Sequence, residues 1–203
     1  MEQASLFRLT APSEGFFKDR GSKFYAFCFP VRELEEVEEF LKSVKKKYHD
    51  ARHHCFAYRL GKQAQIEFAT DDGEPSHSAG DPILGALKSA QLSWTLAIVV
   101  RYFGGTKLGI RGLIEAYRSA TENALQEGQV EEIIPKIRFV LEYAYDKTSA
   151  INKILHPFPL NEVESVYTDL CRQTFSIRQE VFPALAERLK NSGFSIEKME
   201  ESE

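Results

Sequence analysis

The stretch that decides the fold is Thr95–Tyr102, TLAIVVRY, which runs straight into the glycine-rich sequence FGGTKLGIRG at residues 103–112. An almost uninterrupted apolar run of this length, rich in β-branched side chains, predicts a central strand buried on both faces. Apolar residues then recur at helical spacing from Gly112 onward, which predicts a long helix with Gly128 as its left-handed cap. The segment therefore reads as a strand, a glycine loop and a helix.

The sequence before this segment predicts further strands and helices. We expect strands at residues 23–29, 53–60 and 65–70, and helices over residues 33–48 and from Asp81 to about residue 92. Gly61 and Lys62 indicate a tight hairpin, and Asp81 followed by Pro82 is typical of an N-cap and a first helical residue. The lysine run at residues 45–47 reads as a solvated helix end rather than a nucleic-acid patch.

After a polar joint at residues 131–135 the pattern starts again. We expect strands at residues 137–143, 162–167, 171–178 and 194–199, with helices over residues 147–155 and 183–191. This βαββαβ order is that of the ferredoxin-like split βαβ motif. The prediction is an α+β protein with an N-terminal domain over residues 1–132 and a C-terminal domain over residues 135–203.

Composition limits the classes of function. The 203 residues are 43% hydrophobic and 28% charged, which is typical of globular proteins. A net charge of -4 argues against nucleic-acid binding over the whole surface, so any site for a polyanion must be local. No apolar run is long enough to span a bilayer and residues 1–10 lack a signal-peptide pattern, so we expect a cytoplasmic protein with no membrane partner.

The glycine loop and its surroundings form a candidate anion site. Four basic residues and one acidic residue, Glu115, lie between positions 101 and 118. Backbone amides at a helix start, helped by the helix dipole, favour phosphate or carboxylate. The candidate anion- or nucleic-acid-binding residues are Arg101, Gly104, Gly105, Lys107, Gly109 and Arg111. The loop is neither a Walker A nor a GxGxxG motif. The alternative is that its glycines only permit a tight turn.

The acidic segment at residues 71–80 carries the candidate catalytic groups. Asp72, Glu74 and His77 could supply acid-base chemistry or ligate a metal, although Asp and Gly residues also simply initiate turns. A role in forming the turn is favoured over metal binding for these residues. No metal and no cofactor are therefore predicted. His53 and Cys55 share a face of a predicted strand, where a buried cysteine beside a hydrogen-bonded histidine is favoured over a nucleophilic pair or a zinc site.

Other features have a structural and a functional interpretation. Cys28, Cys55 and Cys171 are widely spaced in apolar surroundings, which predicts reduced core residues. Aromatic residues near the basic loop could stack on bases, as single-strand binders do, or could belong to the core. They are Trp94, Tyr102, Phe103 and Tyr117.

At these residues the chain resembles the YigZ/IMPACT family. The resemblance rests on ARHHCFAY at residues 51–58, DDGEPS at 71–76, AG at 79–80 with PIL at 82–84, and RYFGG at 101–105 with KLG at 107–109. It covers about the first 130 residues strongly, and the remainder is similar to the small second domain of bacterial members. The sequence departs from the family pattern at His77 and Ser78, where Gly-Thr is usual, and at Arg111, where a small residue is common.

The resemblance implies a fold and a link to translation. It implies a first domain like the second domain of small-subunit ribosomal protein five, and a second domain like domain V of elongation factor G. Eukaryotic members act on the general-control kinase pathway through an RWD domain, which has no counterpart in this sequence, so that role does not carry over. Nucleic-acid binding is inferred for the family from fold and surface.

These observations support two hypotheses. The leading hypothesis is a non-enzymatic, translation-associated regulator that binds RNA, the ribosome or another anionic ligand, such as a phosphate-bearing small molecule, in the glycine-rich basic cleft. The alternative is a small-molecule hydrolase or phosphoryl-transfer enzyme that uses Asp72, Glu74 and His77.

Overall fold

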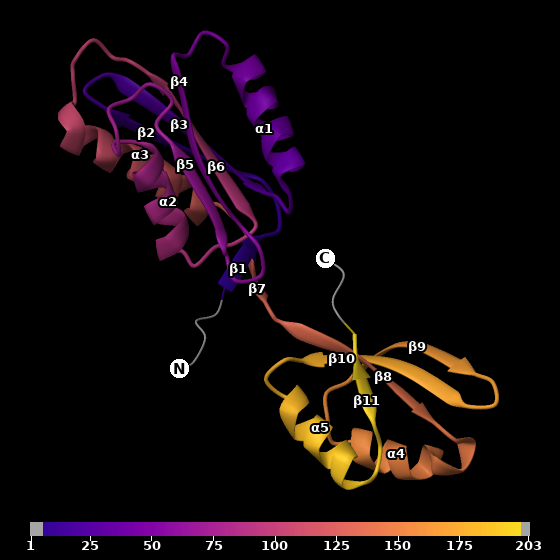
Figure 1. Ribbon diagram of the computed structural model, residues 1–203. Helices are drawn as coiled ribbons and strands as arrows, with labels where there is room; N and C mark the ends of the chain where they lie inside the picture. Colours follow the sequence, from indigo (N-terminus) through magenta and orange to yellow (C-terminus); the bar gives the residue numbers. More distant parts are fainter. Residues whose placement is uncertain (1–5, 200–203) are drawn as a thin grey trace. The chain divides into compact units, whose positions relative to one another are not determined.

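The chain forms two compact units, Met1–Ile133 and Ile134–Glu203. They are seen in a computed structural model that describes residues 6–199 (Figure 1). The fold is mixed α/β, and every pair of neighbouring strands in its sheets is antiparallel. Over residues 6–199 no helix is both long and apolar enough to cross a membrane. Each unit is described by itself below.

A five-stranded sheet with the order β2-β3-β6-β4-β5 forms the centre of the first unit. Its strands are β2 (Ser13–Asp19), β3 (Ser22–Pro30), β4 (His53–Leu60), β5 (Ile66–Thr70) and β6 (Thr95–Tyr102). The prediction of a central strand at Thr95–Tyr102 is confirmed, because β6 lies between β3 and β4 and is buried from Thr95 to Arg101. Because β6 is covered on both faces, its C-terminal end is held rigidly where the glycine loop begins.

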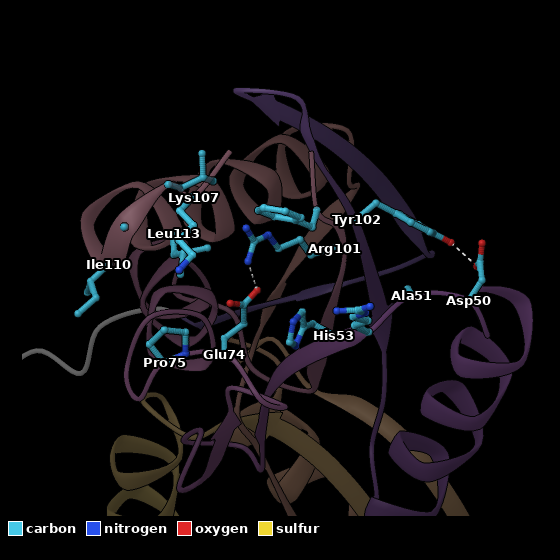
Figure 2. Close-up of a pocket in the computed structure, with 14 residues that line it drawn as sticks. Asp50, Ala51, His53, Glu74, Pro75, Arg101, Tyr102, Lys107, Ile110 and Leu113 are labelled. Carbon is cyan, nitrogen blue, oxygen red and sulfur yellow. Dashed lines mark hydrogen bonds and ion pairs between the residues drawn. The ribbon is translucent and has the colours of Figure 1, made fainter. Parts of the chain in front are cut away.

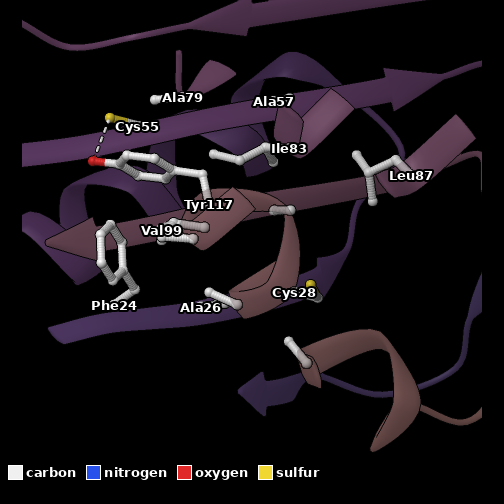
Figure 3. Close-up of a cluster of buried hydrophobic side chains, with 14 of the residues drawn as sticks. Phe24, Ala26, Cys28, Cys55, Ala57, Ala79, Ile83, Leu87, Val99 and Tyr117 are labelled. Carbon is white, nitrogen blue, oxygen red and sulfur yellow. Dashed lines mark hydrogen bonds between the residues drawn. The ribbon is translucent and has the colours of Figure 1, made fainter. Parts of the chain in front are cut away.

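Helices cover both faces of this sheet (Figure 1). Helix α1 (Leu34–Lys47) lies on one face, and α2 (Gly80–Ser89) and α3 (Gly109–Gln126) lie on the other. Figure 3 shows the core on the α2 and α3 side, where Tyr117 approaches Cys55 and packs edge-on against Phe24 with ring centroids 5.1 Å apart. Cys28, Cys55 and Cys171 are free and buried, as predicted. Burial raises the pKa of Cys28 to about 12, so this thiol stays protonated.

Three strands were missed from the sequence. The first predicted strand is preceded by β1 (Leu6–Leu9) and β2, and the supposed joint at residues 131–135 contains β7 (Val130–Ile133). Strands β1 and β7 form a separate antiparallel ribbon in which Arg8 pairs with Glu131. Strands of four residues carry little periodicity, and the two glutamates of β7 read as a loop because their strand is largely exposed.

Several predicted helix and turn boundaries were wrong. Helix α2 begins at Gly80, so Asp81 and Pro82 lie inside its first turn instead of capping it. The hairpin between β4 and β5 spans residues 61–65 rather than two residues. Gly128 does not adopt the left-handed conformation; a Cβ there would lie 2.7 Å from Cδ2 of Leu9, so the position needs glycine for space. Helix α3 begins at Gly109, before the predicted start at Gly112.

The second unit has the predicted βαββαβ order. Its elements are β8 (Lys136–Tyr143), the 3₁₀ turn η1 (Tyr145–Lys147), α4 (Thr148–Leu155), β9 (Asn161–Tyr167), β10 (Cys171–Arg178), α5 (Phe182–Asn191) and β11 (Ile196–Lys198). The sheet order is β11-β8-β10-β9. Alternate residues of β8 and β10 pack against α4 and α5, and the residues between them face away from both helices.

Candidate functional site

A pocket of about 660 Å³ opens in the first unit beside the C-terminal end of β6. Residues 71–79, named here the acidic turn, border it on one side, and residues 103–109, the glycine loop, border it on the other (Figure 2). Its lining consists of Asp50, Ala51, Arg52, His53, Glu74, Pro75, Arg101, Tyr102, Phe103, Lys107, Leu108, Gly109, Ile110 and Leu113. The acidic turn and the glycine loop therefore border the same pocket.

Within the acidic turn, Asp71 holds the start of α2 in place. One carboxylate oxygen accepts hydrogen bonds from the N–H groups of Ala79 and Gly80 at 2.9 and 2.8 Å, and the other accepts from the N–H of His77 at 2.8 Å. Burial opposes the charge, but the bonds from Gly80, Ala79 and His77 outweigh it, so the pKa of Asp71 lies below its ordinary value. Asp71 therefore caps α2 from outside the helix.

Asp72 ties the acidic turn to β4. Its carboxylate accepts a hydrogen bond from the N–H of His54 at 2.7 Å, and its carbonyl oxygen lies 2.9 Å from Nδ1 of His53. Because a carbonyl oxygen only accepts, Nδ1 of His53 carries a proton. In the neutral ring Nε2 is then an acceptor, and His53 lines the pocket.

Glu74 lies at the base of the pocket in a buried ion pair with Arg101. Oε1 of Glu74 accepts from Nη1 of Arg101 at 2.6 Å and from the hydroxyl of Tyr117 at 2.8 Å. The two charged side chains are only 4% and 8% exposed. Burial raises the pKa of Tyr117, so its hydroxyl stays a donor. The thiol of Cys55 lies 3.3 Å from this hydroxyl and is also buried in the core.

Arg101 has one hydrogen-bonding group left over. Its Nε is buried and has no hydrogen-bond partner among residues 6–199. The guanidinium lies between two aromatic rings, with Cζ 5.6 Å from the ring centroid of Phe24 and 5.7 Å from that of Phe103. A buried donor without a partner is costly, since it has lost its bonds to water. The cation is thus held by Glu74 and the rings while part of its donor capacity is unused.

The glycine loop needs its glycines for backbone reasons. A Cβ at Gly104 would lie 1.9 Å from the carbonyl carbon of Gly21, because the loop passes directly over the β2–β3 turn. Gly105 and Gly109 have φ of +90° and +74°, which favours glycine. The interpretation of the glycines as turn formers therefore accounts for Gly104, Gly105 and Gly109. It does not account for the basic residues among them.

Helix α3 begins at the rim of the pocket with its N-terminus open. Its N-cap residue, Leu108, makes no side-chain capping bond among residues 6–199, and its first turn contains no acidic residue. Its first backbone N–H groups therefore carry a partial positive charge without an internal partner. Gly109 and Ile110 of this turn line the pocket together with Lys107. Arg111 is exposed on the same turn but lies outside the lining.

The candidate catalytic residues do not converge. Of Asp72, Glu74 and His77, only Glu74 lines the pocket. The His77 side chain is 81% exposed and bonds through Nδ1 to Asp81 at 2.7 Å. Its φ of +62° is one that glycine adopts freely, which explains why the family pattern has glycine at this position. Over residues 6–199 no three metal-ligating side chains lie close enough together to hold an ion.

Sequence reasoning missed several lining residues. His53 is hydrogen-bonded and Cys55 is buried, as predicted, but the place of His53 in the pocket lining was not foreseen. Asp50 was not considered, although it accepts a hydrogen bond from the Tyr102 hydroxyl at 2.6 Å. This bond lowers the pKa of Asp50 and raises that of Tyr102 to about 12. The signal that could have found His53 is its motif, ARHHCFAY, because the motif lies on the strand next to β6.

Comparison with known proteins agrees with this architecture. The family model described as the Impact N-terminal domain matches residues 20–125. The IMPACT family member YvyE of Bacillus subtilis is 44% identical over 117 residues, 57% of this chain and 54% of that protein, so the match spans about half of the relative. The IMPACT family member YigZ of Escherichia coli is 31% identical over 166 residues, covering 80% of this chain and 78% of that one.

A solved structure extends the likeness to both units. The crystal structure of a hypothetical protein matches with a TM-score of 0.65 at 26% identity, over 98% of each chain. The matched domain contains every element that borders the pocket, from β4 through the start of α3. The chain therefore belongs to the YigZ/IMPACT family.

Proposed function

We propose that the protein is a translation-associated regulator without enzymatic activity that holds RNA phosphate in this pocket. One observation carries the proposal: a buried arginine with an unused donor, a lysine and the open N-terminus of α3 border the same concavity. Helix N-termini and basic side chains are a recurrent combination for phosphate. Such a role would place the protein in the cytoplasm.

The charges around the pocket support an anionic ligand. Glu74 is neutralised by Arg101, whereas the Asp50 carboxylate keeps its charge and accepts a hydrogen bond from the neutral hydroxyl of Tyr102. Lys107 is exposed and has no carboxylate partner among residues 6–199, and Arg111 adds a second such cation near the rim. An anion in the pocket would meet Lys107 and the backbone N–H groups at the start of α3.

The second unit offers a further contact surface for RNA. On the sheet face away from α4 and α5, Lys136 lies directly opposite Arg178, and Arg138 follows on the same side of β8. Like charges facing each other across strands are unfavourable. Arg178 lies 3.6 Å from a carboxylate oxygen of Glu180, but within residues 6–199 neither Lys136 nor Arg138 is paired with a carboxylate. A phosphate backbone would relieve that repulsion.

The fold supports the same proposal by likeness alone. We propose that the first unit is related to the second domain of small-subunit ribosomal protein five. The strand order of the second unit, β11-β8-β10-β9, is compatible with the ferredoxin-like arrangement of domain V of elongation factor G. Both likenesses point towards the ribosome, but a fold by itself assigns no activity.

Binding of the full-length chain to a short single-stranded oligoribonucleotide and to ribosomes tests the proposal. The double variant Lys107→Gln, Arg111→Gln should weaken binding at least several-fold and flatten its salt dependence, because two phosphate contacts are lost. The matched control Lys45→Gln, Lys46→Gln removes the same charge from the exposed end of α1. The proposal fails if both double variants bind like the wild type, or if only the control loses affinity.

A further inference from the structure

We propose that the pocket binds one unstacked nucleotide of a single-stranded RNA, with its phosphate at the start of α3 and its base against the ring of Phe103. The inference rests on the proposed function, because it takes the phosphate site as given and names what accompanies the phosphate. Three features of the pocket lead to it: an apolar half, an exposed ring of that half beside the arginine, and a histidine acceptor.

A bare phosphate would leave the apolar half of the pocket uncovered. Phe103 and Ile110 are each 58% exposed, and they border the pocket together with exposed Pro75. Large apolar side chains that remain in water around a concavity gain free energy when a ligand covers them, at roughly 25 cal/mol per Å². The ligand should therefore carry an apolar surface next to its anionic group.

The ring of Phe103 is placed for stacking. Arg101 lies over the ring of Phe103, with Cζ 5.7 Å from the ring centroid. More than half of Phe103 remains exposed to solvent. The aromatic surface and the phosphate-binding cation therefore adjoin each other, as base and phosphate do within one nucleotide. Aromatic side chains beside basic groups are how proteins commonly bind single strands, since every base has a π-face.

His53 supplies an acceptor that fits ribose. The bond from Nδ1 to the carbonyl oxygen of Asp72 fixes the tautomer, so neutral His53 offers a lone pair at Nε2. A hydroxyl group can donate to that lone pair, and phosphate without a proton cannot. The 2′-hydroxyl is the group by which a protein distinguishes RNA from DNA.

The pocket favours a single strand over a duplex. Its volume, about 660 Å³, is typical of sites that enclose one small ligand, and Glu74 and Arg101 lie at its base rather than on a ridge. In a duplex the bases stack on each other and only the backbone would reach the rim. An unstacked nucleotide can present phosphate, ribose and base to the same pocket.

Titration calorimetry with the full-length protein tests the inference with four probes: a short oligoribonucleotide, its duplex, the deoxy strand of equivalent sequence, and inorganic phosphate. Phe103→Leu should weaken binding of the single strand by about 5- to 100-fold and binding of phosphate far less. The matched control is Phe16→Leu, since Phe16 is 46% exposed on β2 and outside the pocket lining. The wild type should prefer the single strand to the duplex and to DNA, and His53→Ala should abolish the preference over DNA.

Different failures have different meanings. If phosphate binds but Phe103→Leu affects the oligoribonucleotide no more than Phe16→Leu, the base site is wrong and the anion site stands. If the duplex binds as tightly as the single strand, single-stranded RNA is the wrong ligand class. If phosphate does not bind, and substitution of Lys107 and Arg111 leaves RNA affinity unchanged, the proposed function itself fails.

Discussion

The acidic turn and the glycine loop face each other across one pocket, yet they use their polar groups in opposite ways. Asp71, Asp72 and Glu74 of the acidic turn are each bonded to the protein itself. In the glycine loop and the first turn of α3, Lys107 has no carboxylate partner among residues 6–199 and no side chain caps the helix. The acids of the motif build the pocket, and its basic side is free for a ligand.

The N-termini of α2 and α3 show the same contrast. Asp71 occupies the start of α2, where its carboxylate accepts from the N–H groups of Ala79 and Gly80. The first turn of α3 has no acidic residue of its own, and the carboxylate that the structure places beside it, that of Asp19, lies 4.0 Å from the position of a Cβ at Gly112. A carboxylate that takes the place of an anion stabilises the start of α2, so we expect an external phosphate at the start of α3 instead.

Removing the charge of Glu74 should have the largest effect. Glu74→Gln leaves the cation of Arg101 without a counter-charge at a site only 8% exposed, so we expect a loss of about 3 kcal/mol in the free energy of unfolding. Denaturation followed by the fluorescence of Trp94, the only tryptophan, reports on the first unit. The exposed pair of Arg8 with Glu131 provides a control, and Glu131→Gln should cost less than about 1 kcal/mol.

Adding inorganic phosphate to the Glu74→Gln variant tests whether an anion can replace the missing carboxylate. If phosphate binds beside Arg101, millimolar phosphate should recover part of the stability lost in Glu74→Gln, because the anion replaces the missing negative charge. Equal stabilities of Glu74→Gln and Glu131→Gln would contradict the view that the acidic turn holds Arg101.

Removing Asp71 should have an intermediate effect. Asp71→Ala takes the acceptor from three backbone N–H groups near the start of α2, and we expect a loss of about 2 kcal/mol in the free energy of unfolding. Asp81→Ala is the matched control, because the Asp81 side chain is 59% exposed and bonds to His77 alone. A cost at Asp81 as large as that at Asp71 would show that the cap has been assigned to the wrong residue.

The same residue predicts a dependence on pH. The pKa of Asp71 is lower in the folded state than its ordinary value of about 3.9, so its contribution to stability is complete above that pH and is lost as the pH falls through the folded value. The stability difference between the wild type and Asp71→Asn, measured by urea denaturation, should be constant above about pH 5 and shrink below about pH 4. A difference that stays constant down to pH 2 would contradict the assignment.

Changing His77 should have the smallest effect. The side chain is 81% exposed and outside the pocket lining, so His77→Asn, which tolerates the left-handed backbone, should change stability by less than about 0.5 kcal/mol and leave phosphate affinity unaltered. Lys107→Gln, measured beside it, should weaken phosphate binding. A strong loss at His77 alone would instead favour the enzymatic hypothesis.

The sequence predicted elements wherever the burial pattern was strong. Strand β6 and the βαββαβ order of the second unit followed from long apolar or periodic runs. Strands β1 and β7 were missed because each has only four residues and pairs with a partner more than a hundred positions away, which local patterns do not encode. The acidic turn was interpreted as a set of candidate catalytic groups for a related reason. Its local sequence, DDGEPS, does not indicate that Asp71 accepts a hydrogen bond at a helix start eight residues later.

Backbone amide shifts during a phosphate titration, recorded by ¹H–¹⁵N correlation NMR, test the contrast between the two loops most directly. The account predicts saturable shifts at Gly109, Ile110 and Arg111 and at the side chain of Arg101, while the amides of Ala79 and Gly80 stay unchanged because Asp71 already holds them. Saturable shifts at the start of α2, or none at the start of α3, would contradict it.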